Sequence, residues 1–171
     1  MVSGTAADAA RRDEALALLE RVMDPEVPVL SVVELGIVRD VEVAGDVVTV
    51  VVTPTYSGCP AMRVIEEEIV AALAAGGFRG ARVRTVYAPA WTSDWIAEPA
   101  REKLRAYGIA PPTRGARDDE LVPLERRAPS VACPYCGSTR TEMRSQFGST
   151  ACKATLYCRD CRQPFEQFKA I

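Results

Sequence analysis

Four cysteines near the C-terminal end restrict the fold of this chain more than any other feature of its sequence. They occur in two pairs, within CPYC and CRDC, and 21 residues separate the pairs. Each pair can place two sulfurs of one tight turn on the same ion, and strands between the pairs can bring the turns together into a tetrahedron. The candidate ligands of a structural zinc ion are Cys133, Cys136, Cys158 and Cys161.

Composition and length support a metal at these cysteines. The chain has no histidine, so its metal ligands must be cysteine, aspartate, glutamate or main-chain groups. Residues 131–171 are too few to bury a sufficient core, and zinc coordination would supply about 10 kcal/mol or more of folding free energy. An iron–sulfur cluster on the same four thiolates is the alternative. A further cysteine in this segment, Cys152, is expected to be a small buried hydrophobe rather than a functional thiol.

The rest of the chain predicts a small α+β domain. Apolar residues recur with helical spacing over 8–23 and 60–75, while 37–53 has the pattern of a β-hairpin and 81–87 that of another strand. A further helical segment begins at Pro99. This order predicts a small mixed sheet with helices on one side, followed by a four-cysteine zinc ribbon.

The composition also predicts the domain boundaries. Residues 111–130 are rich in proline and charge, which is typical of a linker. We therefore expect three parts: an α+β domain at 1–110, a linker at 111–130 and a zinc-ribbon module at 131–171.

Several functions are disfavoured by what the sequence lacks. No apolar run approaches the ~20 residues of a membrane span and no signal peptide is visible, which predicts a cytoplasmic protein. Residues 1–110 carry 11 basic and 16 acidic side chains, and the basic residues of the tail are scattered, so a nucleic-acid partner is not expected. Without histidine, a phosphate-binding loop or a nucleotide-binding motif, the chain is not predicted to be an enzyme.

The sixth cysteine stands apart from the others. Cys59 lies between a glycine and a proline at the expected start of the second helix, where unpaired amides and the helix dipole stabilise negative charge. We expect Cys59 to be the N-cap residue and its thiol pKa to be lowered. Asp24 and Glu26, in the loop DPEVP, could join this thiolate in holding iron transiently. Turn and capping roles for the two acids are an equal alternative.

Two segments, which contain these acids and Cys59, resemble a known family. The segments DPEVPVLSVVELGIVRDVEV and TPTYSGCPAM resemble the SufT-like iron–sulfur assembly domain family, whose members are small α+β proteins. The resemblance implies that Asp24, Pro25, Glu26 and Cys59 belong to one shared site. With AWTSDWI, GIAPP, CPYCGS, FGSTACKA and CRQPFEQFK added, nearly the whole chain resembles the PaaD (PaaJ) family of bacterial phenylacetyl-CoA epoxidase systems.

The resemblance implies a role in phenylacetate degradation, beside a di-iron oxygenase and a reductase that carries flavin and an iron–sulfur centre. The kinship with SufT-like proteins implies maturation, in which iron or an iron–sulfur cluster is inserted into one of these partner subunits. The implied cofactors are structural zinc and transiently held iron or cluster. The alternative is a non-catalytic structural or docking subunit of the epoxidase complex, in which Cys59 only caps a helix. A homodimer is compatible with the sequence.

Overall fold

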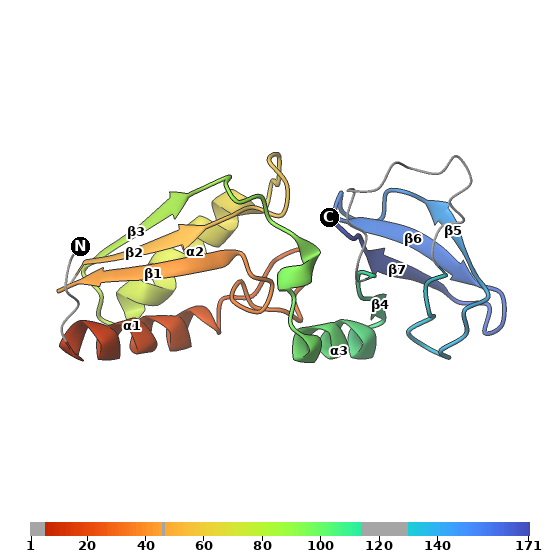
Figure 1. The fold of residues 1–171 in the computed structure, drawn as a ribbon, viewed down its shortest axis with the longest axis horizontal. Helices are drawn as coiled ribbons and strands as arrows, with labels where there is room; N and C mark the ends of the chain where they lie inside the picture. Colours follow the sequence, from red (N-terminus) through yellow and green to blue (C-terminus); the bar gives the residue numbers. More distant parts are fainter. Residues whose placement is uncertain (1–5, 46, 114–129) are drawn as a thin grey trace. The chain divides into compact units, whose positions relative to one another are not determined.

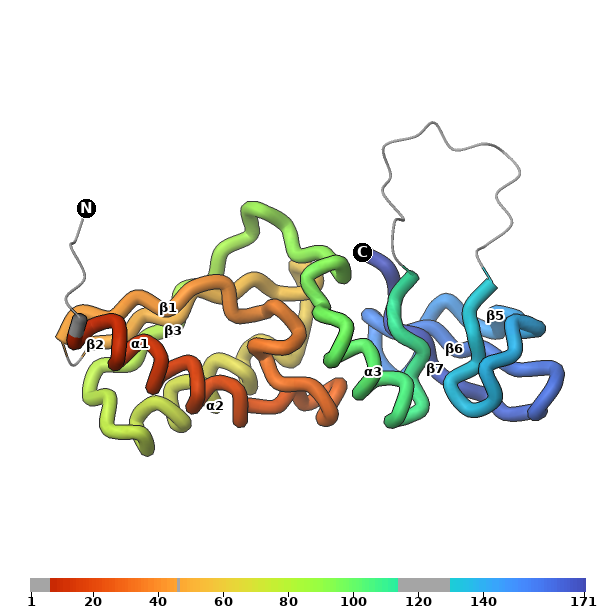
Figure 2. The backbone as a smooth tube through the Cα atoms, turned by 60° about the horizontal axis from the view of Figure 1, so that its bottom comes forward, coloured from red at the N-terminus to blue at the C-terminus, as the bar shows by residue number. Residues whose placement is uncertain are grey.

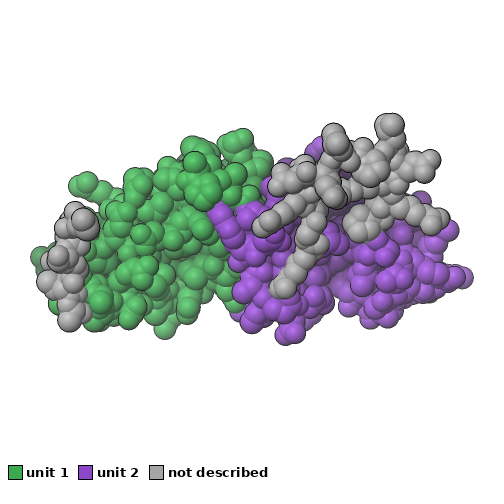
Figure 3. Space-filling view, viewed as in Figure 1, with its two compact units in different colours: residues 1–91 green, residues 92–171 purple. Residues whose placement is uncertain are grey.

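The computed structural model describes residues 6–45, 47–113 and 130–171 (Figure 1). They form two compact units, one that extends to Trp91 and one that begins at Thr92 (Figure 3). Each unit contains helix and sheet, and the second contains the clustered cysteines, so the predicted α+β class with a C-terminal ribbon is confirmed. No helix in the described ranges is long and apolar enough to cross a membrane.

The first unit is a three-stranded sheet with two helices packed on one face. β2 is the middle strand, antiparallel to β1 and parallel to β3, as its apolar residues on both faces lead one to expect. Figure 2 shows the two helices side by side, and they cover the face on which Val41 and Val50 are buried. The elements are α1 Ala6–Leu19, β1 Val38–Ala44, β2 Val47–Val52, α2 Met62–Ala75 and β3 Gly80–Thr85.

Both predicted helix limits next to the candidate thiol site are wrong. α1 ends at Leu19, because the residues that follow turn back and Met23 forms an antiparallel bridge with Ser31. α2 begins at Met62 and its N-cap is Ala61, which makes no side-chain capping bond. Cys59 is therefore not the N-cap residue.

The second unit joins a short helical segment to the ribbon. Its four-stranded sheet has the order β4-β7-β6-β5, with β4 parallel to β7 and the other pairs antiparallel. Ala110 of β4 lies in the same hydrophobic core as Leu156 and Phe165 of the ribbon. The elements are the 3-10 turn η1 Ser93–Trp95, α3 Glu98–Tyr107, β4 Ile109–Ala110, β5 Thr141–Ser145, β6 Lys153–Cys158 and β7 Pro164–Phe168.

The structure thus groups residues differently from the predicted boundary at 110. α3 and β4 belong to the compact unit of the ribbon, because β4 extends the ribbon sheet and contributes to its core. Of the predicted linker at 111–130, residues 114–129 lie outside the described residues.

Candidate functional site

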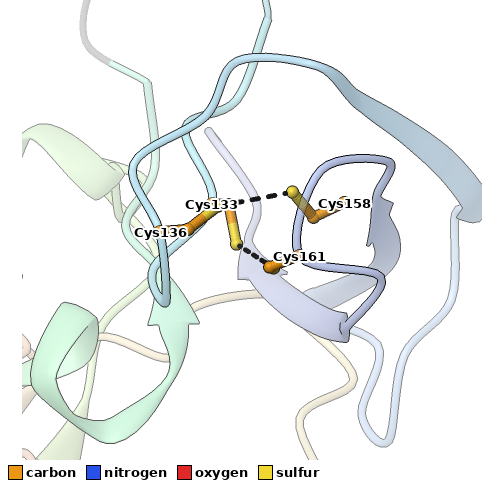
Figure 4. Close-up of side chains that lie close together, drawn as sticks. All are labelled: Cys133, Cys136, Cys158 and Cys161. Carbon is orange, nitrogen blue, oxygen red and sulfur yellow. Dashed lines mark hydrogen bonds between the residues drawn. The ribbon is translucent and has the colours of Figure 1, made fainter.

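Two tight turns of the second unit bring four cysteines to one point (Figure 4). Cys133 and Cys136 precede β5, Cys158 ends β6, and Cys161 precedes β7. Their four Sγ atoms lie within 4.8 Å of one another, and the Cys133–Cys161 and Cys136–Cys158 pairs are each 3.6 Å apart. An ion bound tetrahedrally at about 2.3 Å separates its sulfurs by about 3.8 Å. The donor set and its spacing therefore fit one tetrahedral ion better than a cluster, in which the cysteines bind different irons.

Left-handed backbone closes both cysteine turns. Gly137 follows the first pair with φ of +73°, and Arg162 follows the second with φ of +58°. In the first turn the Gly137 N–H donates to the Cys133 carbonyl at 2.9 Å. A glycine adopts this conformation without strain, whereas a residue with a side chain does so at a cost of about 1–2 kcal/mol. The sequence signals the first turn by its glycine but gives no such signal for the second.

Backbone donors and one carboxylate support the cysteine turns. The pKa of the Cys158 thiol is lowered to about 7, chiefly by the Cys161 N–H and further by the Asp160 N–H. Together these donors lower the pKa by more than desolvation raises it. The lowered pKa favours the thiolate of Cys158, the form that binds metal, whereas desolvation raises the pKa of the Cys161 thiol to about 12. The Asp160 carboxylate accepts hydrogen bonds from the Ser138 hydroxyl and the Arg140 guanidinium, and Arg140 lowers the Asp160 pKa. Asp160 thereby links the second cysteine turn to the first.

The second candidate site is the thiol of Cys59, in the loop between β2 and α2. Cys59 is half-buried, and its Sγ accepts hydrogen bonds from the Ala61 N–H and the Thr55 side chain. Desolvation has the largest effect and raises the thiol pKa, and the negative charges of Glu26 and Asp24 raise it further. The predicted lowering of the Cys59 pKa is therefore wrong. The donors from Ala61 and Thr55 do not compensate for burial beside two carboxylates.

Asp24 holds the loop on which it lies. It is 5% exposed, and its Oδ1 accepts the N–H groups of Glu26 and Val27 at 2.8 Å each. Its own N–H donates to the Leu30 carbonyl at 2.9 Å. The turn-forming role that was an alternative for Asp24 is therefore present in the structure. Glu26 is partly exposed, and its charge affects the Cys59 pKa more than that of Asp24 does.

The structure brings the two acids into electrostatic contact with Cys59 without forming a complete metal site. In the described ranges, the four ribbon cysteines are the one group of three or more such side chains with donor atoms close enough to hold an ion. Sequence reasoning missed Thr55, which is buried and bonds to the thiol, although it stands in the same TPTYSGCP segment. We call Asp24, Glu26, Thr55 and Cys59 the Cys59 site.

Alkylation of Cys59 as a function of pH tests the raised pKa. Because the thiolate is the reactive form, the midpoint of the rate is expected above about 8.5, the value of an unperturbed thiol. Glu26→Gln removes a negative charge and is expected to lower the midpoint, whereas the same change at the exposed Glu68 of α2 leaves it unchanged. Peptide-resolved mass spectrometry separates Cys59 from the ribbon cysteines. A midpoint at or below about 8.5 contradicts this prediction.

Two family models together cover most of the chain. One described as "PaaD zinc beta ribbon domain" matches residues 117–169, and one described as "Iron-sulfur cluster assembly protein" matches residues 12–86. The four clustered cysteines fall within the first match, and the Cys59 site falls within the second.

Individual proteins agree with these matches. A protein of Porphyromonas gingivalis described as "Fe-S protein maturation auxiliary factor" is 33% identical over 94 residues, which cover 54% of this chain and 89% of that protein. The crystal structure of a DUF59 domain from Bacillus anthracis has a TM-score of 0.55 and 27% identity, covering 57% of this chain and 94% of that chain.

The match with a third protein covers both units. A component of the "Putative 1,2-phenylacetyl-CoA epoxidase" of Escherichia coli (strain K12) is 45% identical over 158 residues, which cover 92% of each chain. Because this identity extends over the assembly domain and the ribbon alike, the chain belongs to the PaaD family of phenylacetyl-CoA epoxidase subunits.

Proposed function

We propose that this protein is an accessory maturation factor of a phenylacetyl-CoA epoxidase system, which assists the insertion of iron or an iron–sulfur cluster into a partner subunit. The observation that carries the proposal is the Cys59 site, where a half-buried thiol lies under the electrostatic influence of Glu26 and Asp24. Two relatives support the proposal, since one is described as a component of a putative epoxidase and another as a maturation auxiliary factor.

The chemistry of the Cys59 site suits temporary binding. Burial and the nearby carboxylates keep the thiol protonated at neutral pH, so an incoming iron must displace the proton before the sulfur can bind. The side chains of the site do not form a complete ligand set, and the cargo therefore keeps positions open for the ligands of the recipient. Thiolate and carboxylate are both ligands that iron accepts in proteins. Weak binding with open positions favours transfer over storage.

We propose zinc as the ion at the four cysteines, with a structural role. Four thiolates close the tetrahedron and leave no position for a substrate, as in structural zinc sites generally. The ion would hold Cys133, Cys136, Cys158 and Cys161 together and so stabilise the second unit.

Cys59→Ser tests the maturation role. We expect the variant to fold and to keep its zinc, because Cys59 belongs to the other unit. Iron and acid-labile sulfide in the co-expressed epoxidase subunits are expected to fall about tenfold or more, since even supporting residues of metal sites contribute factors of that size. Metal per subunit, measured after purification, is the readout.

Ser57→Ala is the matched control, because Ser57 is an exposed residue of the same loop. It should leave metal loading unchanged. Fully loaded epoxidase subunits in the Cys59→Ser background would refute the maturation role. If this result came with co-purification in fixed stoichiometry, the protein would be a structural subunit of the complex instead.

A further inference from the structure

The loop between β5 and β6, residues 146–152, is held by several backbone hydrogen bonds. The Gly148 N–H donates to the Lys153 carbonyl at 2.8 Å, and the Lys153 N–H donates to the Thr150 carbonyl at 3.1 Å. The loop is also bonded to the residue after β7, since the Lys169 N–H donates to the Cys152 carbonyl at 2.9 Å. These hydrogen bonds hold the backbone of Gly148, Thr150 and Cys152 to the ribbon.

An ion pair between a buried lysine and the partly exposed Glu166 supports the middle of the 146–152 loop. Lys153 is 5% exposed, and its Nζ lies 3.0 Å from Glu166 Oε2. Glu166 also accepts hydrogen bonds from the Ser149 N–H at 2.5 Å and the Ser149 hydroxyl at 3.1 Å. A Cβ atom at Gly148 would lie 2.6 Å from Glu166 Oε1, so a side chain at that position would displace the carboxylate. Cys152, the last residue of the loop, is buried as expected.

This fixed loop presents an aromatic ring to solvent. Phe147 is 69% exposed, whereas Phe165 and Phe168 of the same unit are 4% and 1% exposed. The Lys169 ammonium lies 4.7 Å from the centroid of the Phe147 ring and donates to the Ala151 carbonyl at 2.8 Å. The ring is therefore held by a cation on one side and is otherwise largely in water. An aromatic side chain on a preorganised loop is typical of the central anchor of a protein interface.

The Lys169 charge beside the Phe147 ring indicates which kind of partner surface could bind there. In the described part of the chain no carboxylate pairs with the Lys169 ammonium, and residues 130–171 contain six basic and three acidic side chains. A complementary surface would thus combine an apolar pocket with a carboxylate at its edge. One ammonium beside one ring is too little charge for a nucleic acid or an anionic membrane, which require several basic residues.

We propose that the 146–152 loop is a docking element for a partner protein, with Phe147 seated in an apolar pocket and Lys169 paired with a carboxylate at the rim. The occupant we assign is the epoxidase subunit that receives iron or cluster, so this inference rests on the proposed function. The Cys59 site and the docking element then lie in different units and perform separate tasks, one in holding the cargo and the other in choosing the recipient.

Binding of the full-length, zinc-loaded protein to purified epoxidase subunits tests the proposal. The probes are the reductase subunit and the di-iron oxygenase subunits, each depleted of its metal, and the readout is Kd by calorimetry. Phe147→Ala is expected to weaken binding by about 30-fold, the loss of a typical interface anchor. Met143→Ala, at an apolar residue of β5 that is 50% exposed, is the matched control and should change Kd by less than about twofold. Increasing salt from about 50 to about 500 mM should weaken wild-type binding.

Folding controls and three binding results distinguish the docking element from its alternatives. Zinc content and thermal unfolding of Phe147→Ala should equal those of the wild type, because the ring is mostly exposed. An unchanged Kd in Phe147→Ala, or no binding of any subunit by the wild type, overturns the docking element. Self-association or binding to anionic vesicles that depends on Phe147 overturns the assigned occupant. Cys59→Ser should bind like the wild type while failing to load metal, so failure of docking and failure of maturation give different results.

Discussion

Substitution of Cys158 by alanine is expected to unfold the entire second unit, including α3, while the first unit stays folded. Cys158 is fully buried, and its sulfur is one of the four that converge in the ribbon. Structural zinc contributes about 10 kcal/mol or more to folding. Whole domains have a free energy of unfolding of about 5–15 kcal/mol. Because the second unit has a small core, its free energy of unfolding is expected to be smaller than the contribution of the zinc.

α3 depends on the cysteine turns although it contains no cysteine. The helix is capped by Gly108, whose φ of +93° favours glycine and which lies against Tyr135: a Cβ atom there would lie 2.8 Å from the Tyr135 hydroxyl. Tyr135 stands between the two cysteines of the first turn. Directly after Gly108, β4 pairs with β7 and places Ala110 in the ribbon core. Unfolding of the first cysteine turn therefore removes Tyr135, the side chain against which the C-terminal end of α3 packs.

Hydrogen exchange measured by mass spectrometry checks this expectation. In Cys158→Ala, peptides from 98–110 should lose protection together with peptides from 153–168, and peptides from 12–86 should keep theirs. Cys152→Ala is the control, because Cys152 is a buried cysteine of the same unit that is not among the clustered four. It should keep its zinc and cost only about 1 kcal/mol. If α3 stays protected in Cys158→Ala, the helix is independent of the ribbon and the metal does not hold the second unit together.

The features that could be predicted from the sequence are those with local signals. The paired CxxC turns, the hairpin and the central position of β2, which is apolar on both faces, depend on spacing and side-chain type within a few residues, and the structure confirms them. The grouping of α3 and β4 with the ribbon had no such signal. It depends on a two-residue strand, β4, and on the packing of Tyr135 against Gly108. Neither contact changes the local pattern of the sequence.

The electrostatics of the Cys59 site could not be predicted for a similar reason. The helix dipole acts mainly within the first turn, and the chain turns at Cys59, whose N–H donates to the Tyr56 carbonyl at 3.2 Å, before α2 begins. Burial then determines the direction of the pKa shift, and the carboxylates that add to it come from a loop more than thirty residues earlier. The sequence placed Asp24 and Glu26 in a loop that could return to the end of the sheet where Cys59 lies, but it held no measure of how far the thiol is buried.

Arg101 is another residue whose role only the folded structure reveals. It lies within α3 and is 2% exposed. Its guanidinium donates to three carbonyl groups, those of Ile96 at 3.0 Å, Pro112 at 2.5 Å and Ser93 at 2.9 Å. These carbonyls lie before and after the helix, so one side chain holds both flanking segments to α3. In the sequence it is an ordinary arginine in a helical pattern that also contains Lys103 and Arg105.

Arg101→Met is therefore expected to destabilise the second unit strongly. Methionine fills a similar length but donates no hydrogen bond, and each charged donor lost to a buried carbonyl costs about 1.5–3 kcal/mol. Allowing for water that reaches some of these carbonyls, we expect a loss of about 3 kcal/mol or more and a fall of about 12 °C or more in the Tm of this unit. Calorimetry of the zinc-loaded protein measures both.

Arg105→Met is the matched control, since it makes the same change four residues later on the same helix. Arg105 is exposed and pairs with Glu98 at 3.1 Å, a surface ion pair whose loss costs about 0.5 kcal/mol. A large difference between the two variants would locate the stability of the segment from Ser93 to Pro112 in the buried guanidinium. Equal effects would mean that its carbonyl bonds contribute no more than a surface pair, and the order of this segment would then depend on β4 and Tyr135 alone.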